Sequence, residues 1–273
     1  MIDSQIQSEL RRRFNPDGSL LRAHQMRMLD ILIYVDKVCR RNGIMYWLSS
    51  GTMLGAVRHG GYIPWDDDVD IEMTDSDYRR LVALIAADST SPYVLQHTAS
   101  DNGFLFPFAK LRDTDSYIEE ADGLDAGQKY NGVYIDIFRL RPSNSHALHR
   151  LTSRMLGTEL KFRSRHPHSR IPAAMLRGLL HGIIFPLIRL LDSLGRPARL
   201  RHMIPSYFAA PRFTADLYPL SEVEFEGHSF LAPRDPDAYL KRIYGDYMSI
   251  PDPDKIQIHT SKVVLHRNNQ STQ

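Results

Sequence analysis

The sequence predicts an α+β fold in which a mixed β-sheet is flanked by helices and followed by a largely helical, basic region. Three observations support this. A helical pattern over residues 19–41 precedes several short apolar stretches. One of these, PWDDDVDIEM at residues 64–73, alternates acidic and apolar residues, and Lys and Arg are concentrated in residues 139–212. A helix, a strand, a helix and then further strands are typical of a sheet packed against helices.

Composition limits the kinds of protein and site that the chain can form. Its 273 residues can bury a sizeable core, and 42% hydrophobic with 24% charged residues are usual for a soluble protein. The single cysteine, Cys39, excludes an intrachain disulfide and a structural thiolate-zinc site. The first residues lack the apolar segment of a signal peptide, so we expect a cytoplasmic protein.

Charge is distributed unevenly although the net charge is only +2. Residues 139–212 contain 14 Lys and Arg but only two acids, so this stretch carries about +12 and the rest about −10. Such asymmetry indicates an anionic partner: a membrane surface, a nucleic acid or a polyphosphate. The interleaved aromatic residues of single-strand binders are missing, so we do not expect nucleic acid. We divide the chain into three parts. Residues 1–140 form a catalytic core, residues 141–215 form a basic, largely helical insertion that faces a membrane or an acceptor substrate, and residues 216–273 form a C-terminal segment that packs on the core.

The elements of the core follow from local signals. Ser19 is a suitable N-cap for a helix that ends before Gly43, and Cys39 falls on its apolar stripe. IMYWLSS, from Ile44, predicts a short strand. GTMLGAVRHGGYIP then supplies a turn, a short helix and a Gly-Gly loop, and Ser76 is expected to cap the helix after the acidic strand. Two more strands are predicted at Leu105–Asp113 and Gly132–Leu140, and a helix after Asp235.

Residues 172–191, PAAMLRGLLHGIIFPLIRLL, form an amphipathic helical pattern with a narrow basic stripe that contains Arg177, His181 and Arg189. The longest stretch without a charge is too short to span a bilayer core of about 30 Å. Two interpretations remain open: a core helix packed on the domain, or a helix that lies in a membrane interface.

The acidic strand indicates a metal site. Val69, Ile71 and Met73 alternate with Asp68, Asp70 and Glu72, which predicts a half-buried strand. Asp68 and Asp70 share one face, with Glu72 next in the alternation, while Val69 and Ile71 take the other. Two carboxylates side by side repel each other unless a cation lies between them. The pattern therefore predicts a bound metal ion.

Three known mechanisms use such an acidic pair. A calcium-binding EF-hand loop that began at Asp66 would need Gly and Glu where this chain has Ile71 and Asp77, so that geometry fails. Glycosyltransferases use a D-x-D pair to hold a metal ion on a nucleotide-sugar diphosphate. Nucleotidyltransferase-fold enzymes place Gly-Ser or Gly-Thr on a turn upstream, and a third Asp on a neighbouring strand.

The third pattern fits best. SSGT, residues 49–52, follows a strand and opens a short helix, so Gly51 and Thr52 can form a phosphate cradle. Asp136 is a lone acid among apolar residues in YIDIF, where burial of its carboxylate needs a cation or hydrogen bonds. We predict that Asp68, Asp70 and Asp136 bind Mg²⁺, or alternatively Mn²⁺.

These residues resemble a known family. YWLSSGTMLGAVRHGGYIPWDDDVDIEM is similar to the signature of the LicD family, the bacterial phosphocholine and alditol-phosphate transferases whose animal relatives include fukutin-related proteins. LDILIYVDKVC, FAKLRD, NGVYIDIF and YLKRIYGDYMSIP resemble its other blocks. The resemblance covers about 20–138 and 234–259. The stretch PDPDKIQIH departs from the usual late block of the family. The resemblance therefore does not define the roles of Lys255 and His259.

The resemblance implies a nucleotidyltransferase-like fold and transfer of a substituted phosphate from a CDP-linked donor to a glycan hydroxyl, with release of CMP. It implies a glycan acceptor, either lipid-linked or soluble. By motif position it implies that Asp68 and Asp70 are metal ligands, that Asp136 is the third carboxylate and that Asp66 is an auxiliary ligand. The alternatives are nucleotidyl transfer with pyrophosphate release, and a D-x-D glycosyltransferase. A lipid-linked acceptor and the basic insertion together predict peripheral contact of the protein with an anionic membrane.

Several basic side chains are candidates for donor binding. Arg58, Lys110 and Arg112 are expected to clamp phosphate oxygens, because guanidinium and ammonium groups suit that task. His259 is a further candidate contact to the donor. The aromatic Tyr62 and Trp65, beside the acidic strand, could stack on the cytosine or surround a quaternary ammonium group, but we expect them to pack in the core.

Overall fold

The helix predicted from Ser19 is present in the computed structural model as α2 (Leu20–Arg41). The Ser19 hydroxyl accepts a hydrogen bond from the Arg22 N–H at 3.2 Å, which confirms the predicted N-cap. Cys39 is fully buried, and burial raises the pKa of its thiol to about 12, so this cysteine is an inert core residue.

The structure describes residues 2–98, 100–101, 104, 106, 108–120, 128–165, 170–194, 198–202, 210–252 and 260–265. The chain divides into two compact units. The first comprises Met1–Arg139 and Leu217–Gln273, and the second comprises Leu140–Asp216.

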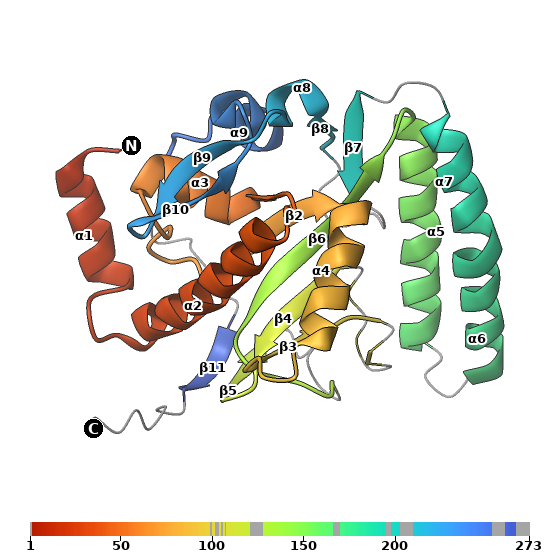
Figure 1. Ribbon diagram of the computed structural model, residues 1–273, viewed down its shortest axis with the longest axis horizontal. Coiled ribbons are helices and arrows are strands. Elements are labelled where there is room, and N and C mark those ends of the chain that lie inside the picture. Colours follow the sequence, from red (N-terminus) through yellow and green to blue (C-terminus); the bar gives the residue numbers. More distant parts are fainter. Residues whose placement is uncertain are drawn as a thin grey trace. The chain divides into compact units, whose positions relative to one another are not determined.

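The first unit contains most of the helices and strands (Figure 1). Besides α2, its described helices are α1 (Ser4–Phe14), α3 (Ser50–His59), α4 (Asp75–Ala87) and α9 (Pro236–Tyr244). Its described strands are β1 (Tyr46–Leu48), β2 (Asp70–Thr74), β3 (Tyr93–Gln96), β4 (Ala109–Asp113), β5 (Ser116–Glu120), β9 (Ser221–Phe225), β10 (His228–Ala232) and β11 (Thr260–Leu265). The strand β6 (Tyr134–Pro142) begins here and ends in the second unit.

The main sheet of this unit has the order β1-β2-β6-β4-β3. β1 pairs antiparallel with β2, and β4 pairs antiparallel with both β6 and β3. Figure 1 shows α2 and α4 in front of the sheet. The fold is therefore a mixed α+β sheet flanked by helices, as the sequence predicted. The strand order places β2 and β6 side by side, although about sixty residues of chain separate them.

Three predicted boundaries differ from the structure. The strand predicted from Leu105 begins at Ala109, and the strand predicted from Gly132 begins at Tyr134. The helix after the acidic strand is capped by Thr74, whose hydroxyl accepts from the Asp77 N–H, so the prediction of Ser76 as the cap was wrong. The helix predicted after Asp235 is α9, and the Asp235 carboxylate accepts from the Ala238 N–H at 2.9 Å.

The acidic strand is buried on both faces, and not on one as its alternation predicted. Glu72 is fully buried, and its Oε2 accepts hydrogen bonds from Trp47 Nε1 (2.9 Å) and from the Tyr239 hydroxyl (3.0 Å). Tyr239 belongs to α9, which comes from the C-terminal part of the chain. Elements distant in sequence therefore cover the face that the local pattern assigned to solvent.

The second unit is built around three helical segments, α5 (His146–Arg165), α6 (Arg170–Leu179) and α7 (Phe185–Ser193). A π-helical turn, η1 (Leu180–Ile184), joins α6 to α7. The end of β6 pairs with β7 (Arg199–His202), β7 pairs with β8 (Arg212–Phe213), and α8 (Thr214–Leu217) follows.

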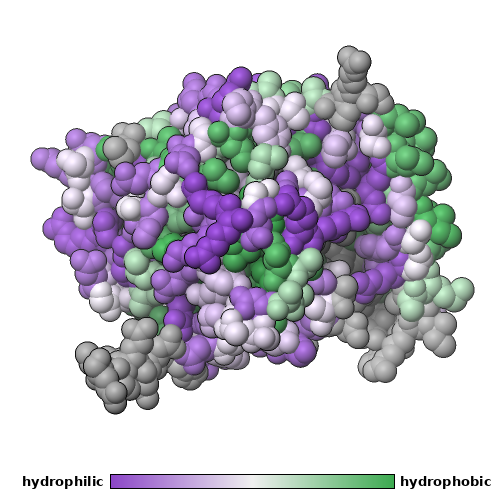
Figure 2. All heavy atoms as spheres, in the orientation of Figure 1, coloured by the Kyte–Doolittle hydropathy of each residue, from purple (hydrophilic) through white to green (hydrophobic). Residues whose placement is uncertain are grey.

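The stretch at 172–191 is not a core helix. Among the described residues one helix, Ala174–Ser193, is long and apolar enough to cross a membrane, contrary to our estimate from sequence, and only 11% of it is buried. Figure 2 shows hydrophobic side chains over the region that α6 and α7 occupy in Figure 1.

Three buried histidines make the stability of the protein dependent on pH. Burial lowers the pKa of His24 to about 4, of His59 to about 3 and of His149 to about 4, and nearby Arg charges lower the last two further. In the unfolded chain a histidine titrates near 6.5. The stability that the neutral rings confer is therefore present above about pH 6.5 and is lost as the pH falls toward 4.

We expect the free energy of unfolding to fall by about 1 to 2 kcal/mol per buried histidine between pH 7 and pH 5, measured by urea denaturation. His24→Leu should reduce this loss, because neither ring nitrogen of His24 has a hydrogen-bond partner among the described residues. His146→Leu, at an exposed position, is the matched control. An identical pH dependence in His24→Leu and wild type would contradict the prediction.

Candidate active site

The turn between β1 and α3 forms one wall of the site. The Ser49 N–H donates to the Asp70 carbonyl at 3.0 Å, and the Thr52 hydroxyl accepts from the Asp70 N–H at 2.8 Å. Ser50 opens α3 with φ = 48°, a left-handed conformation that non-glycine residues rarely adopt. The first N–H groups of α3 carry partial positive charge and point toward the end of the helix, where an anion can bind.

Gly51 permits a close approach between this turn and the acidic loop. A Cβ atom at this position would lie 2.8 Å from Asp66 Oδ2. The loop is held on its other side by Gln25, whose Nε2 donates to the Asp66 carbonyl at 2.9 Å. Gln25 is held in turn by Asn15 Nδ2 at 2.8 Å. Asp66 is therefore placed against the start of α3 by contacts from two helices.

Asp136 reaches the same region from the neighbouring strand. Its N–H donates to the Val69 carbonyl at 2.7 Å, so β6 runs beside the residue that separates Asp68 from Asp70. On its other side Asp136 is paired across the sheet with Lys110 of β4, and Lys110 Nζ lies 3.8 Å from Asp136 Oδ1.

The four predicted acids influence each other electrostatically. Burial raises the pKa of Asp70 well above its usual range, and the charges of Asp68, Asp136 and Asp66 raise it further, while a hydrogen bond from Ser50 lowers it. Burial likewise raises the pKa of Asp66, with added contributions from the charges of Asp68 and Asp67. Carboxylates that destabilise each other's charged form in a buried place are what a divalent cation would stabilise.

The fit to a metal ion rests on charge and on donor chemistry. Among the described residues, no three His, Cys, Asp or Glu side chains are arranged to hold an ion together. Mg²⁺ is usually bound through one or two carboxylates, with waters and substrate phosphates completing its shell. The oxygen donors of this site suit such an open arrangement and do not suit a closed, all-protein cage.

The predicted phosphate clamps lie in different surroundings. Arg58 is buried, and its Nη1 donates to the carbonyls of Tyr247 (2.9 Å) and Ser249 (3.0 Å), while the charge of Asp66 counteracts the lowering of its pKa by burial. Lys110 is buried beside Asp136, with Nζ 3.3 Å from the centre of the Tyr134 ring. His259 lies outside the described residues.

Arg112 is fully buried and serves the fold. It donates to Gln96 Oε1, to the Gly132 carbonyl at 2.8 Å and to Gln128 Oε1 at 3.0 Å. These bonds tie β4 to β3 and to the loop before β6. All three guanidinium nitrogens are thus engaged with protein oxygens, an arrangement that differs from the phosphate clamp we predicted.

Three contributors to the site were missed from sequence. Ser50, in its left-handed conformation, forms a hydrogen bond with Asp70. Tyr134 covers the Lys110 ammonium. The Tyr239 hydroxyl lies 3.0 Å from the Ser49 hydroxyl and donates to Glu72, so it joins these two residues. Only Ser50 had a local signal, since it belongs to the SSGT turn. Tyr62 is buried against Phe225 as expected, whereas Trp65 is only half-buried, against Phe14 and His59.

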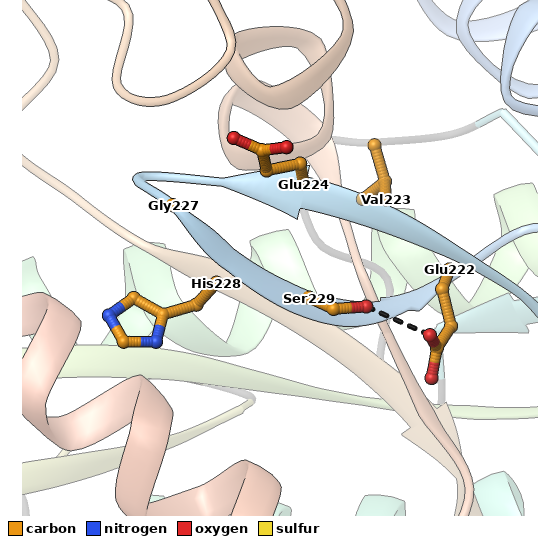
Figure 3. A pocket seen from close by; sticks show the side chains of 6 residues that line it. All are labelled: Glu222, Val223, Glu224, Gly227, His228 and Ser229. Carbon is orange, nitrogen blue, oxygen red and sulfur yellow. Dashed lines mark hydrogen bonds between the residues drawn. The ribbon is translucent and has the colours of Figure 1, made fainter.

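A separate depression of about 310 Å³ lies on the β9–β10 hairpin (Figure 3). It is lined by Glu222, Val223, Glu224, Gly227, His228 and Ser229. Figure 3 shows Ser229 bonded to Glu222, while the His228 and Glu224 side chains point away from each other. None of the predicted site residues contributes to it, so we do not assign the chemistry there.

The comparison with known proteins identifies the domain. Residues 43–177 match the family model described as LicD/FKTN/FKRP, nucleotidyltransferase domain. This range contains the SSGT turn, the acidic strand and Asp136.

Individual relatives agree with the model. The chain is 28% identical to the lipopolysaccharide cholinephosphotransferase LicD of Haemophilus influenzae, over 88% of this chain and 95% of that protein. It is 43% identical to the human ribitol 5-phosphate transferase FKRP over 21% of this chain and 12% of that protein. It is 28% identical to the mouse ribitol-5-phosphate transferase FKTN over 50% of this chain and 25% of that protein. The chain thus spans almost all of the bacterial relative but only a small part of the animal ones, and its residues 43–177 are a LicD/FKTN/FKRP nucleotidyltransferase domain.

Proposed function

We propose that this chain transfers a substituted phosphate, either phosphocholine or an alditol phosphate such as ribitol or glycerol phosphate, from a CDP-linked donor to a hydroxyl of a cell-surface glycan. CMP is the leaving group. The observation that most directly supports the proposal is that the charges of Asp66, Asp68 and Asp136 all act on the buried Asp70. Asp66 and Asp70 also lie against the turn that opens α3.

The family makes the chain a phosphotransferase enzyme. The names of its relatives, a cholinephosphotransferase and ribitol-phosphate transferases, support the two kinds of transferred group. The name of the bacterial relative also supports a glycan acceptor, because it contains the word lipopolysaccharide.

The cofactor that we propose is Mg²⁺, with Mn²⁺ as the alternative, held by Asp68 and Asp70 with Asp136 and Asp66 as supporting carboxylates. When bound, the ion would neutralise charge on the donor diphosphate. The backbone N–H groups at Gly51 and Thr52 would bind phosphate oxygens at the start of α3.

The transfer step forms a bond between the acceptor oxygen and the phosphorus that carries the substituent, and breaks the bond from that phosphorus to the CMP oxygen. Such a step depends mainly on positioning and on neutralisation of charge. Asp136 would accept the proton of the attacking hydroxyl, since it enters the site from the neighbouring strand. Lys110, 3.8 Å away, would stabilise the ionised Asp136 that this role requires.

A donor panel tests the proposal. We expect CMP release from CDP-choline, CDP-ribitol or CDP-glycerol in the presence of Mg²⁺, loss of this release in EDTA, and its recovery on addition of Mg²⁺ or Mn²⁺. Release of pyrophosphate from a nucleoside triphosphate, without CMP release from any CDP-linked donor, would contradict the proposal in favour of nucleotidyl transfer. Sugar transfer from a nucleotide-sugar would favour the glycosyltransferase alternative.

A further inference from the structure

The helix formed by α6, η1 and α7 has one buried and one exposed apolar side. Leu180, Phe185, Ile188 and Asp192 are buried, and α5 packs against α6 and α7. The opposite side carries large apolar residues that are between 48% and 71% exposed. We call these residues the apolar row: Met175, Leu179, Ile183, Leu187, Leu190, Leu191 and Leu194.

The π turn keeps the apolar row on one side of the helix. Residues four apart drift by about 40° per step around a regular α-helix. Met175, Leu179, Ile183 and Leu187 follow that spacing through η1, where the Phe185 N–H bonds to the Leu180 carbonyl, five residues back. Pro186 accounts for the wider turn, because its ring would collide with the carbonyl of Gly182 in a regular α-helix.

Asp192 prevents this helix from leaving its own unit to cross a bilayer, because it is bonded to the segment before α5. Its carboxylate accepts hydrogen bonds from Arg141 (2.9 Å), from the Ser143 hydroxyl (2.7 Å) and from the N–H groups of Asn144 (3.1 Å) and Ser145 (2.7 Å). Insertion would break this network and place a carboxylate in hydrocarbon, at a large cost. The helix can therefore present the apolar row to a surface only while it remains packed on its own unit.

The positive charge of residues 139–212 indicates which partner the apolar row contacts. The stretch 139–212 carries about +12, and both of its acids are engaged within this unit: Asp192 pairs with Arg141, and Glu159 makes a 2.8 Å contact with His181. A second copy of this chain would bring an equally basic surface to the contact. An anionic bilayer offers apolar chains to the row and negative headgroups to the basic residues around it.

We propose that the apolar row docks this chain in the plane of an anionic membrane surface, with the helix parallel to the bilayer. Basic side chains such as Arg177, half-exposed on α6, contact the headgroups. This inference goes beyond the proposed function and does not depend on the group transferred. Its test measures binding without any activity, so the two can fail separately.

Vesicle flotation of the full chain provides the test. We expect the protein to float with phosphatidylcholine vesicles that contain phosphatidylglycerol, and binding to fall at high salt. Ile183→Glu/Leu187→Glu should lower the bound fraction at least about tenfold, because two large apolar side chains lose their burial. Ile6→Glu/Leu20→Glu, an equal change at exposed apolar positions of α1 and α2, should bind like wild type.

A charge variant separates the two contributions. Arg177→Gln should weaken binding to the anionic vesicles about fivefold and leave any binding to pure phosphatidylcholine unchanged. Thermal melting confirms that each variant is folded. Absence of flotation with both vesicle types, or equal flotation of the Ile183→Glu/Leu187→Glu variant, would overturn the inference. Concentration-dependent dimerisation of wild type that this variant abolishes, without flotation, would assign the row to a second copy and would also overturn it.

Discussion

Asp70→Asn should lower the transferase activity of this chain by about 10³-fold or more while making the metal-free protein more stable. The Asp70 carboxylate is buried among the charges of Asp68, Asp136 and Asp66, and burial together with these charges raises its pKa well above the usual range. Asparagine keeps the shape and removes one of the repelling charges. The free energy of unfolding in EDTA should rise by about 1 kcal/mol or more.

The two effects are measured by CMP release and by thermal melting with and without Mg²⁺. Mg²⁺ should raise the melting temperature of wild type, because it binds the folded state, and should raise that of the variant much less. Asp75→Asn is the matched control: this acid follows β2 directly, but it pairs with Arg79 at 2.9 Å and with Arg139. It should retain activity and lose stability. Full activity in Asp70→Asn, or a lower melting temperature than wild type in EDTA, would refute the metal-site interpretation.

Local signals were enough to predict the main elements of the core. Ser19 and Asp235 act as caps within single turns of chain, so their helices could be placed from neighbouring residues. The alternation of Val69 and Ile71 with Asp68 and Asp70 likewise predicted a strand at the correct place in the chain, although β2 is assigned only from Asp70.

What sequence reasoning missed depends on contacts between distant segments. Glu72 was assigned to an open face, but Tyr239, 167 residues later, donates to it and closes that face. Arg112 was assigned to phosphate binding because an arginine near an acidic site suits that role. Its engagement with Gln96, Gly132 and Gln128 depends on how β3 and the loop before β6 are arranged. The same limit applies to residues 172–191. Their sequence pattern shows an amphipathic helix, but it does not show which side of the helix packs against the rest of the protein.

The β9–β10 hairpin is a further long-range element that positions the loop before the acidic strand. Glu226, at its tip, accepts from Arg22 Nη2 at 2.6 Å and from the Tyr62 N–H at 3.0 Å. A Cβ atom at Gly61 would collide with the Glu226 carboxylate, so the glycine permits this contact. Burial acts to raise the pKa of Glu226, but the bonds from Arg22 and Tyr62 outweigh it and the pKa is lowered, as expected of a stabilised carboxylate.

We therefore expect Glu226→Ala to lower the free energy of unfolding by about 3 to 5 kcal/mol, since it leaves the Arg22 charge, only 15% exposed, without its carboxylate. Glu226 has φ = 51°, and alanine would keep that backbone cost, so the loss reports the missing contacts and not the turn. Urea denaturation measures the loss. Activity should fall as well, because residues 60–63 lead directly into the acidic loop.

Two comparisons make this result specific. Glu222→Ala removes another hairpin carboxylate that pairs with an arginine, Arg40, but both side chains of that pair are more exposed, so stability should barely change. Arg22→Met/Glu226→Met should be less destabilised than the sum of its single variants, because no uncompensated buried charge remains. If Glu226→Ala instead unfolded at the same urea concentration as Glu222→Ala, the hairpin would not be what holds the acidic loop, and the position of Asp66 would have to depend on Gln25 and Gly51 alone.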